Sequence, residues 1–158
     1  MPEISADPYR NFRFRVLLDG VAVAGLSKMS AVKRTTETVE WREAGGNSTV
    51  RKMPGRSKME PITLEAGLTQ STQFLEWAEQ VSNPTGDGGT LANFRKPVTV
   101  QVLNMQGVAV KAFTLDRAWP SEFQATPEMD ANANTVAITI LKVEYESFSI
   151  DRSVKEPT

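Results

Sequence analysis

The sequence predicts a mainly β protein, an antiparallel β-barrel or two-sheet sandwich that carries one α-helix. Segments in which apolar and polar residues alternate recur along the chain, as they do in half-buried strands. A single segment has the period of about 3.6 residues that is typical of an amphipathic helix. Short turn signals separate the strand segments, which favours antiparallel neighbours in hairpin order. The 158 residues contain no linker that would divide them, so residues 1–158 are expected to form one domain.

The segments before the predicted helix are an arm, a hairpin and two further strands. Residues 1–10 have no periodicity and are expected to form an N-terminal arm. Residues 11–26 hold two apolar segments around an Asp-Gly turn dipeptide and predict a hairpin. Residues 33–41 are rich in β-branched side chains and predict a strand. Residues 61–68 alternate regularly, with their isoleucine, leucines and alanine facing inward.

The helix is predicted over residues 71–82. Its apolar residues recur at i, i+3, i+4 and i+7, and they are Phe74, Trp77, Ala78 and Val81. Thr69 or Ser71 can cap its start, and an Asn-Pro dipeptide ends it. The Gly-rich residues that follow lack the spacing of a phosphate-binding loop and predict an ordinary loop.

The second half of the chain adds four strand segments. They lie at 97–103, 108–115, 121–125 and 135–148. In the last of them the apolar positions change parity between Ile140 and Leu141. Either a β-bulge shifts the strand by one residue, as in bent barrel strands, or both faces of the strand are covered.

Composition excludes several classes of function. Apolar residues make up 40% of the chain and charged residues 23%, and the net charge of −1 argues against a general binder of nucleic acid or membrane surfaces. No apolar run is long enough for a membrane helix, so no membrane anchoring is expected. The chain has no Cys and no His, which removes disulfides, Cys/His zinc sites and the usual catalytic triads. We expect no catalytic residue, no metal and no cofactor.

Two further patterns have ordinary structural explanations. Glu144 and Glu146 alternate on one strand and could form an acid–base pair, but acids at this spacing are more often a solvated strand face. Trp41, Trp77 and Trp119 each lie in an otherwise apolar strand, helix or strand end. Core positions are therefore favoured for all of them over an exposed stacking surface.

The segment GGNSTVRKMPGRSKMEP, residues 45–61, is the most unusual part of the chain. It has no apolar periodicity and no aromatic residue on which a base could stack. Its only carboxylate is Glu60, against the cations Arg51, Lys52, Arg56 and Lys58. The pattern predicts an extended loop over 44–60, which is either solvated or in contact with an acidic surface of a neighbouring protein. Loops of this length in compact domains are usually functional or disordered.

Taken in order, these segments resemble the T4-like contractile tail tube protein family, which includes the tubes of contractile phage tails and of extracellular contractile injection systems. The resemblance begins with FRFRVLLDG and VAGLS within 12–30. It is most specific in TETVEWREAGGNSTVRKMPGRSKMEPITLEAGLT, residues 36–69, because strand patterning would not fix residue identities in a loop. Trp77, the AWP at 118–120 and the closing strand TVAITILKVEYES at 135–147 continue the resemblance.

The resemblance implies a structural protein and not an enzyme. Family members have two packed sheets and a helix, six copies form a ring in which neighbouring sheets join, and rings stack into a hollow tube inside a contractile sheath. The implied partners are further copies of the chain, the sheath protein, baseplate or hub and tube-terminating proteins, a tape-measure protein, and DNA or protein cargo in the lumen. Assembly in the cytoplasm of the bacterial host, as part of a virion tail or injection particle, is implied as well.

The resemblance also assigns contacts between subunits to the 44–60 loop. We expect the cations Arg51, Lys52, Arg56 and Lys58 to meet carboxylates of neighbouring copies. The expected contact residues also include Gly45, Gly46, Pro54 and Gly55, of which the three glycines are expected to supply tight or left-handed backbone turns. The candidate carboxylates are Glu3, Asp7, Glu144, Glu146 and Asp151.

Three alternatives stay open at this point. A monomeric β-barrel that binds a small apolar ligand predicts a closed sheet without a long exposed edge. A type VI-like secreted tube or cargo-carrier protein would use the same kind of assembly. A β-barrel enzyme that uses Glu or Lys would need convergent polar residues in a pocket.

Overall fold

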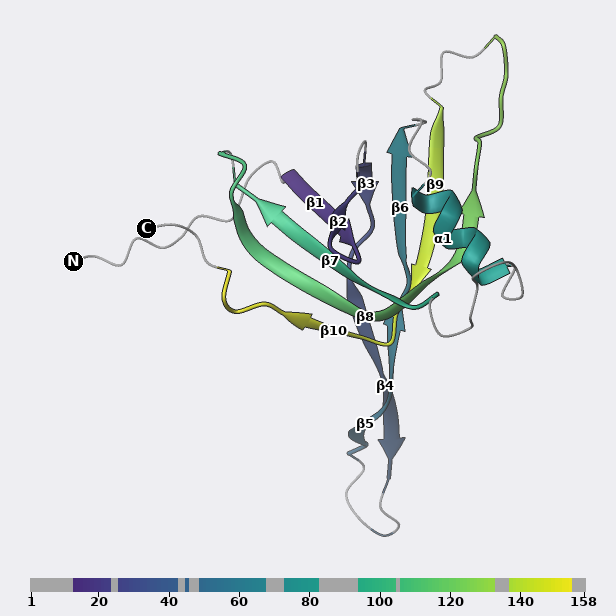
Figure 1. Cartoon of the computed structure of the whole chain (residues 1–158). Helices are drawn as coiled ribbons and strands as arrows, with labels where there is room; N and C mark the ends of the chain where they lie inside the picture. The colour runs from purple at the N-terminus through teal and green to yellow at the C-terminus, as the bar shows by residue number, and fades with distance from the viewer. Residues whose placement is uncertain are drawn as a thin grey trace, which may run out of the picture.

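The computed structural model describes residues 13–23, 26–42, 45, 49–67, 73–82, 94–104, 106–132 and 137–154. Within them the chain forms one helix and ten strands (Figure 1). The elements are β1 Arg13–Leu18, β2 Val21–Ala22, β3 Leu26–Met29, β4 Lys33–Trp41, β5 Arg51–Glu60, β6 Ile62–Gly67, α1 Gln73–Ser82, β7 Lys96–Leu103, β8 Ala109–Gln124, β9 Ile138–Glu144 and β10 Ser147–Ile150. The expected N-terminal arm, residues 1–10, lies outside the described residues.

The main sheet has eight strands in the order β2-β1-β7-β8-β9-β6-β3, and β10 pairs with β8. Neighbouring strands are antiparallel throughout. The two strands that end this order, β2 and β3, do not pair with each other in the described part of the chain. The mainly β fold with one helix is therefore as predicted, and the described strands do not close the sheet into a barrel.

The long strand β8 joins two parts of the sheet. Its first part pairs with β7 on one side and β10 on the other, while its last residues, from Trp119 to Gln124, pair with β9. Figure 1 shows β8 as a long curved strand that runs beneath β7 and turns up towards β9. Our prediction of separate strands at 108–115 and 121–125 is wrong, because both segments belong to this one strand.

The hydrophobic core lies between the two parts of the sheet. Val16 and Val100, from β1 and β7, belong to the same buried cluster as Leu64 and Val143, from β6 and β9. The predicted alternation is confirmed in β6, where every second residue from Ile62 is buried. Full burial of one such aliphatic side chain stabilises the fold by about 1.5–3 kcal/mol, so the cluster fixes how the two parts face each other.

The turn between β1 and β2 follows from its sequence. Asp19 and Gly20 have φ angles of 50° and 83°, and Leu18 pairs with Val21 across them. Positive φ at both central residues is the type I′ geometry that an Asp-Gly dipeptide favours in hairpins. The predicted hairpin is therefore present, although β2 has only two residues and β3 pairs with β6 instead.

The closing segment differs from the single strand predicted over 135–148. It is divided into β9 and β10 by a break at Tyr145 and Glu146, after which the chain passes from the last part of β8 to its first part. Neither strand pairing contains a bulge at Ile140. Leu141 is buried and Ile140 is half-buried, so both faces of β9 are covered to some extent, which was the second of the two explanations.

Helix α1 packs against β8 through Phe74 and Trp77, which are both buried. The indole Nε1–H of Trp77 donates a hydrogen bond to the carbonyl oxygen of Phe94 at 2.6 Å. The core prediction is confirmed for Trp77, whereas Trp119 is half-buried and forms a T-shaped ring contact with Phe94. The prediction that Trp41 lies in the core is wrong, because Trp41 is exposed on the arm described below. In the described part of the chain, no helix is long and apolar enough to cross a lipid bilayer.

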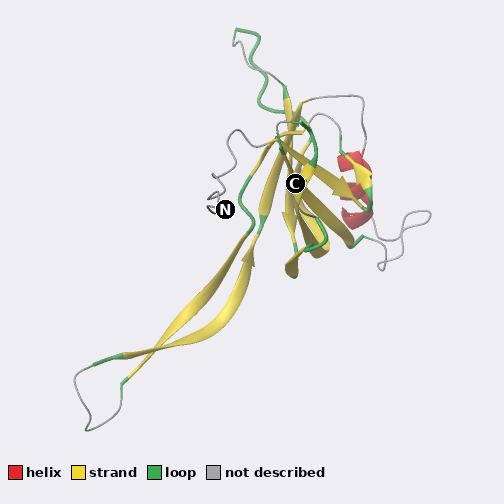
Figure 2. Ribbon diagram, turned by 90° about the vertical axis from the view of Figure 1, so that its left-hand side faces the viewer, coloured by secondary structure: helices red, strands yellow, loops and turns green. Residues whose placement is uncertain are grey.

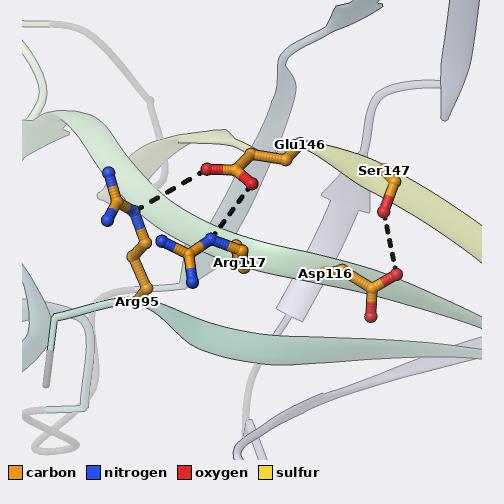
Figure 3. A network of polar contacts seen from close by, with 5 residues as sticks. All are labelled: Arg95, Asp116, Arg117, Glu146 and Ser147. Carbon is orange, nitrogen blue, oxygen red and sulfur yellow. Dashed lines mark hydrogen bonds and ion pairs between the residues drawn. The ribbon is translucent and has the colours of Figure 1, made fainter. Parts of the chain in front are cut away.

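A polar contact holds the corner where β8 passes from one part of the sheet to the other (Figure 3). Glu146, in the break between β9 and β10, forms an ion pair with Arg117, whose Nε lies 3.0 Å from one carboxylate oxygen, and Arg95 Nε lies 4.0 Å from the other oxygen. Beside it, Ser147 donates its hydroxyl to Asp116 at 2.9 Å. Arg117 has a φ angle of 52°, so the corner uses a backbone conformation that L-residues seldom adopt.

Candidate assembly interface

Strands β4 and β5 form a separate two-stranded antiparallel sheet. This arm projects from one end of the body, away from α1, in both views (Figures 1 and 2). The loop predicted over 44–60 is therefore wrong for residues 51–60, which are a strand. The sequence did not predict this strand because a strand that is exposed on both faces needs no alternation of apolar and polar residues.

The arm is exposed almost along its whole length. Every residue of β4 is exposed, and so are the residues of β5 from Arg51 to Lys58. A two-stranded hairpin is marginally stable by itself in water. An arm of this kind therefore has two free faces and two free edges with which it could bind another molecule.

One face of the arm is apolar near its tip. Val39 lies opposite Met53, and Trp41 lies opposite Arg51. Since residues two apart on a strand share a face, Val39, Trp41 and Met53 lie together, with 50%, 46% and 52% of their surfaces exposed. We call these three residues the apolar face of the arm. From the sequence we expected Trp41 to lie in a buried core, whereas it belongs to this exposed face.

The cations of the arm are divided between its two faces. Arg51 lies opposite Trp41 and Lys58 opposite Thr35, which places both on the side of the apolar face. Lys52 lies opposite Glu40 on the other side. The basic residues that looked like one cluster in the sequence therefore do not form a single patch.

Gly55 permits a bulge in the arm. Thr36 pairs with Ser57 and Thr38 with Pro54, so two residues of β5 stand opposite Glu37. A Cβ atom on Gly55 would lie 2.9 Å from Cγ2 of Val39. Gly55 therefore allows the two strands to approach closely, and it does not form the turn that we predicted. Pro54 is tolerated next to it because bulges and edge strands do not need every backbone N–H.

The other residues predicted to shape this segment are placed only in part. Gly45 has a φ angle of 84°, the left-handed conformation that we expected of it. Gly46 lies outside the described residues, and so do the candidate carboxylates Glu3 and Asp7.

Tyr145 connects the base of the arm to the body. Its hydroxyl accepts the backbone N–H of Lys33 at 3.3 Å and donates to the carbonyl of Lys33 at 3.4 Å. Burial raises the pKa of Tyr145 above its ordinary value of 10.0, although the hydrogen bond from Lys33 opposes this rise. Nearby, Ser30 accepts the N–H of Thr63 at 2.7 Å, which holds the chain just before β4 against β6.

The remaining candidate carboxylates have partners within the chain. Glu146 forms both ion pairs that join described residues, with Arg117 and Arg95. Glu144 lies 3.5 Å from the hydroxyl of Ser121. Asp151 accepts hydrogen bonds from the hydroxyl and N–H of Ser153, and these lower its pKa. The structure of one chain does not bring any of the three to the cations of the arm.

A groove that sequence reasoning did not identify lies between α1 and the last part of β8. It has a volume of about 290 Å³, and its apolar lining consists of Leu75, Ala78, Val81, Pro120 and Phe123. Two exposed carboxylates, Glu79 and Glu122, line it as well. Among the described residues, no group of three or more acidic, His or Cys side chains is arranged to hold a metal ion.

Comparison with solved structures identifies the class of fold. A chain of the anti-feeding prophage tube-terminating cap matches with a TM-score of 0.74 and 22% identity, covering 96% of this chain and 99% of that chain. A chain of the sheath–tube complex of the extracellular contractile injection system PVC gives 0.73 and 22%, with 91% of each chain covered. Hcp1 from Flavobacterium johnsoniae gives 0.56 and 17%, covering 87% and 93%. The molecule therefore has the mainly β, single-helix fold that tail tube proteins share with Hcp.

The family follows from the sequence match. A search of curated proteins found no match. The model of the family described as T4-like virus tail tube protein gp19 matches residues 10–149. The chain belongs to this family, whose members are structural tail tube proteins and not enzymes. The resemblance noted in the sequence is thereby confirmed.

Proposed function

We propose that this tail tube protein builds the inner tube of a contractile particle, in which six copies form a ring and rings stack head to tail around a hollow lumen. The arm is the observation that carries the proposal. It is a two-stranded sheet outside the body with both faces exposed, which a monomer has no reason to keep. In a tail tube family member, a neighbouring copy is the natural surface for it to contact.

The open sheet supports ring formation. Its order ends at β1 and β2 on one side and at β3 on the other. Exposed sheet edges invite pairing with another chain, and a closed ring satisfies them in a controlled way. Around such a ring, the β1 and β2 edge of one copy would lie next to the β3 edge of the following copy.

The arm would then connect neighbouring copies. Its cations, Arg51, Lys52, Arg56 and Lys58, are exposed and can set the register against acidic surfaces. Among the candidate carboxylates, Glu146 already pairs with two guanidinium groups, so Glu144, Asp151, Glu3 and Asp7 are better partners for the arm. Gly45, Gly46, Pro54 and Gly55 would shape the arm for these contacts.

The wider partners follow from the same proposal. Similar chains occur in structures of a sheath–tube complex, a baseplate, a tube-terminating cap and a gene transfer agent virion. By analogy, this tube would contact a sheath, a baseplate or hub, a terminating protein and a tape-measure protein, and would conduct DNA or protein. It would assemble in the cytoplasm of the bacterial host, within a phage-like tail or injection particle.

The test compares the full chain with a variant that lacks the outer arm. In this variant Asn-Gly replaces residues 37–56, so that Thr36 and Ser57, a paired position, flank a type I′ turn. We expect rings or hollow tubes of the full chain in negative-stain electron microscopy at high concentration. The variant should remain a folded monomer by circular dichroism and light scattering, because the core cluster contains no residue from 37 to 56.

Two results would contradict the proposal in different ways. Tubes of normal length from the shortened variant would show that the arm is dispensable. A full chain that stays monomeric even beside a baseplate template would exclude the tube, and a small apolar ligand should then be sought in the sheet.

A further inference from the structure

We propose that the apolar face of the arm, Val39, Trp41 and Met53, docks into the groove between α1 and β8 of a second copy of this chain. The inference rests on the proposed function, since it names the surface that the arm meets in the assembly. It goes beyond that function because it joins two surfaces that a single chain keeps apart.

The groove and the apolar face are both apolar surfaces that are exposed in the single chain. The apolar face exposes about half of each of three large side chains at the tip of a thin two-stranded sheet. The groove is lined mainly by aliphatic residues and Phe123, and Leu75 at its edge is itself 40% exposed. Joining the two would remove both apolar surfaces from water, which is the main favourable contribution to association.

The charges of the two surfaces are complementary. Arg51, which lies opposite Trp41, flanks the apolar face, and Glu79 and Glu122 line the groove. Lys142 stands opposite Glu122 in the sheet, but Glu144 lies near Ser121, so carboxylates outnumber cations around the groove. On the arm, Glu37 is farther from the tip than Trp41. Arg51 therefore lies nearer than Glu37 to the end of the arm that would enter the groove first.

Geometry requires that the groove belong to another copy. Val39 and Trp41 are six and eight residues beyond Lys33, the first residue of β4, so they lie roughly 20–26 Å out along the arm. Both views show the arm pointing away from α1 (Figures 1 and 2). A contact between two different surfaces of identical chains is heterologous, and it repeats from copy to copy. Such a contact provides the continuous connection that stacked rings need.

Disulfide trapping tests the docking directly, because the natural chain has no cysteine. Met53→Cys and Ser82→Cys in one chain place thiols on the apolar face and in the groove, while Val39 and Trp41 are kept. Oxidation of the assembled double variant should give a ladder of covalent multimers on a denaturing gel. Met53→Cys with Ser149→Cys is the matched control, since Ser149 is an exposed serine on β10.

The outcomes separate the docking from the tube. A ladder with Ser82→Cys but not with Ser149→Cys supports the docking. Tubes in the microscope with no ladder from Ser82→Cys, or with equal ladders from both pairs, overturn the docking and leave the proposed function intact. A wild-type chain that forms no ring or tube under any condition overturns both.

Discussion

Arg117 is the residue at which the fold tolerates backbone strain. Its φ of 52° is a left-handed conformation, which costs an L-residue about 1–2 kcal/mol. The exposed ion pair with Glu146 stabilises the corner by about 0–1 kcal/mol, which does not offset that cost alone. The strand pairings on either side of the corner therefore hold Arg117 in this conformation.

Comparing Arg117→Gly with Arg117→Ala isolates the strain, since both variants lack the guanidinium. In an ordinary strand, glycine would be the less stable of the two by about 0.5–1 kcal/mol. Here we expect the order to reverse, with glycine more stable by roughly 0.5–1 kcal/mol, because glycine alone adopts positive φ without a steric cost. Urea denaturation of the two variants measures the difference. An alanine variant as stable as the glycine variant would mean that Arg117 is not strained.

At the scale of the element, the arm depends on its base. Its base is held by the hydrogen bonds between Tyr145 and Lys33, by Arg34 over the ring of Phe148 and by Met59, which packs against the core. Every residue of β4 is nevertheless exposed. The bulge at Gly55 adds local twist to an already narrow sheet. Attachment at one end leaves the rest of the arm available to a neighbouring copy.

Tyr145→Phe should weaken this attachment and remove a pH dependence. At neutral pH, loss of the hydroxyl should lower the free energy of unfolding by about 0.5–1.5 kcal/mol. The raised pKa of Tyr145 means that the unfolded chain loses its phenol proton first, so wild-type stability falls as the pH rises above about 10. We expect the gap between wild type and variant to narrow between neutral pH and this alkaline range, as measured by denaturant unfolding. A constant gap would show that Tyr145 does not titrate differently on folding.

At the scale of the whole molecule, the unpaired surfaces point in different directions. The outer sheet edges, the outer part of the arm and the α1–β8 groove are not covered by other described residues. The arm points away from α1, which lines the groove (Figure 2). The net charge of −1 provides little overall repulsion between copies. Assembly should therefore depend on where the charges lie and not on their sum.

Two pairs of substitutions test this dependence on position. Arg51→Gln with Lys58→Gln, on the apolar side of the arm, should impair tube assembly at physiological salt, because the acidic surface of the next copy loses its counter-charges. The control pair is Lys111→Gln with Arg152→Gln, at exposed positions of the body. Each pair removes two positive charges and changes the net charge from −1 to −3, but the control variant should assemble normally. Sedimentation and electron microscopy would compare them. Equal behaviour of the two pairs would refute a specific role for the arm cations.

The sequence by itself determined the elements that have one buried face, and it determined the family. In β6 and α1, the periods of two and 3.6 residues reflect burial against the core, so each could be predicted from local pattern. Asp19-Gly20 likewise specified its turn, because few residues adopt that backbone. The block at 36–69 indicated the family through residues that local structure did not require.

Only the tertiary structure decided the features that depend on distant partners. The strand β5 could not be recognised because most of it is exposed on both faces and its position is set by pairing with β4. The break at Tyr145 follows from the course of β8, and the exposure of Trp41 follows from the arm leaving the body. The groove combines a helix with a strand some 40 residues farther along the chain. Local pattern records which faces are buried, but which surfaces remain open is decided when the elements pack together.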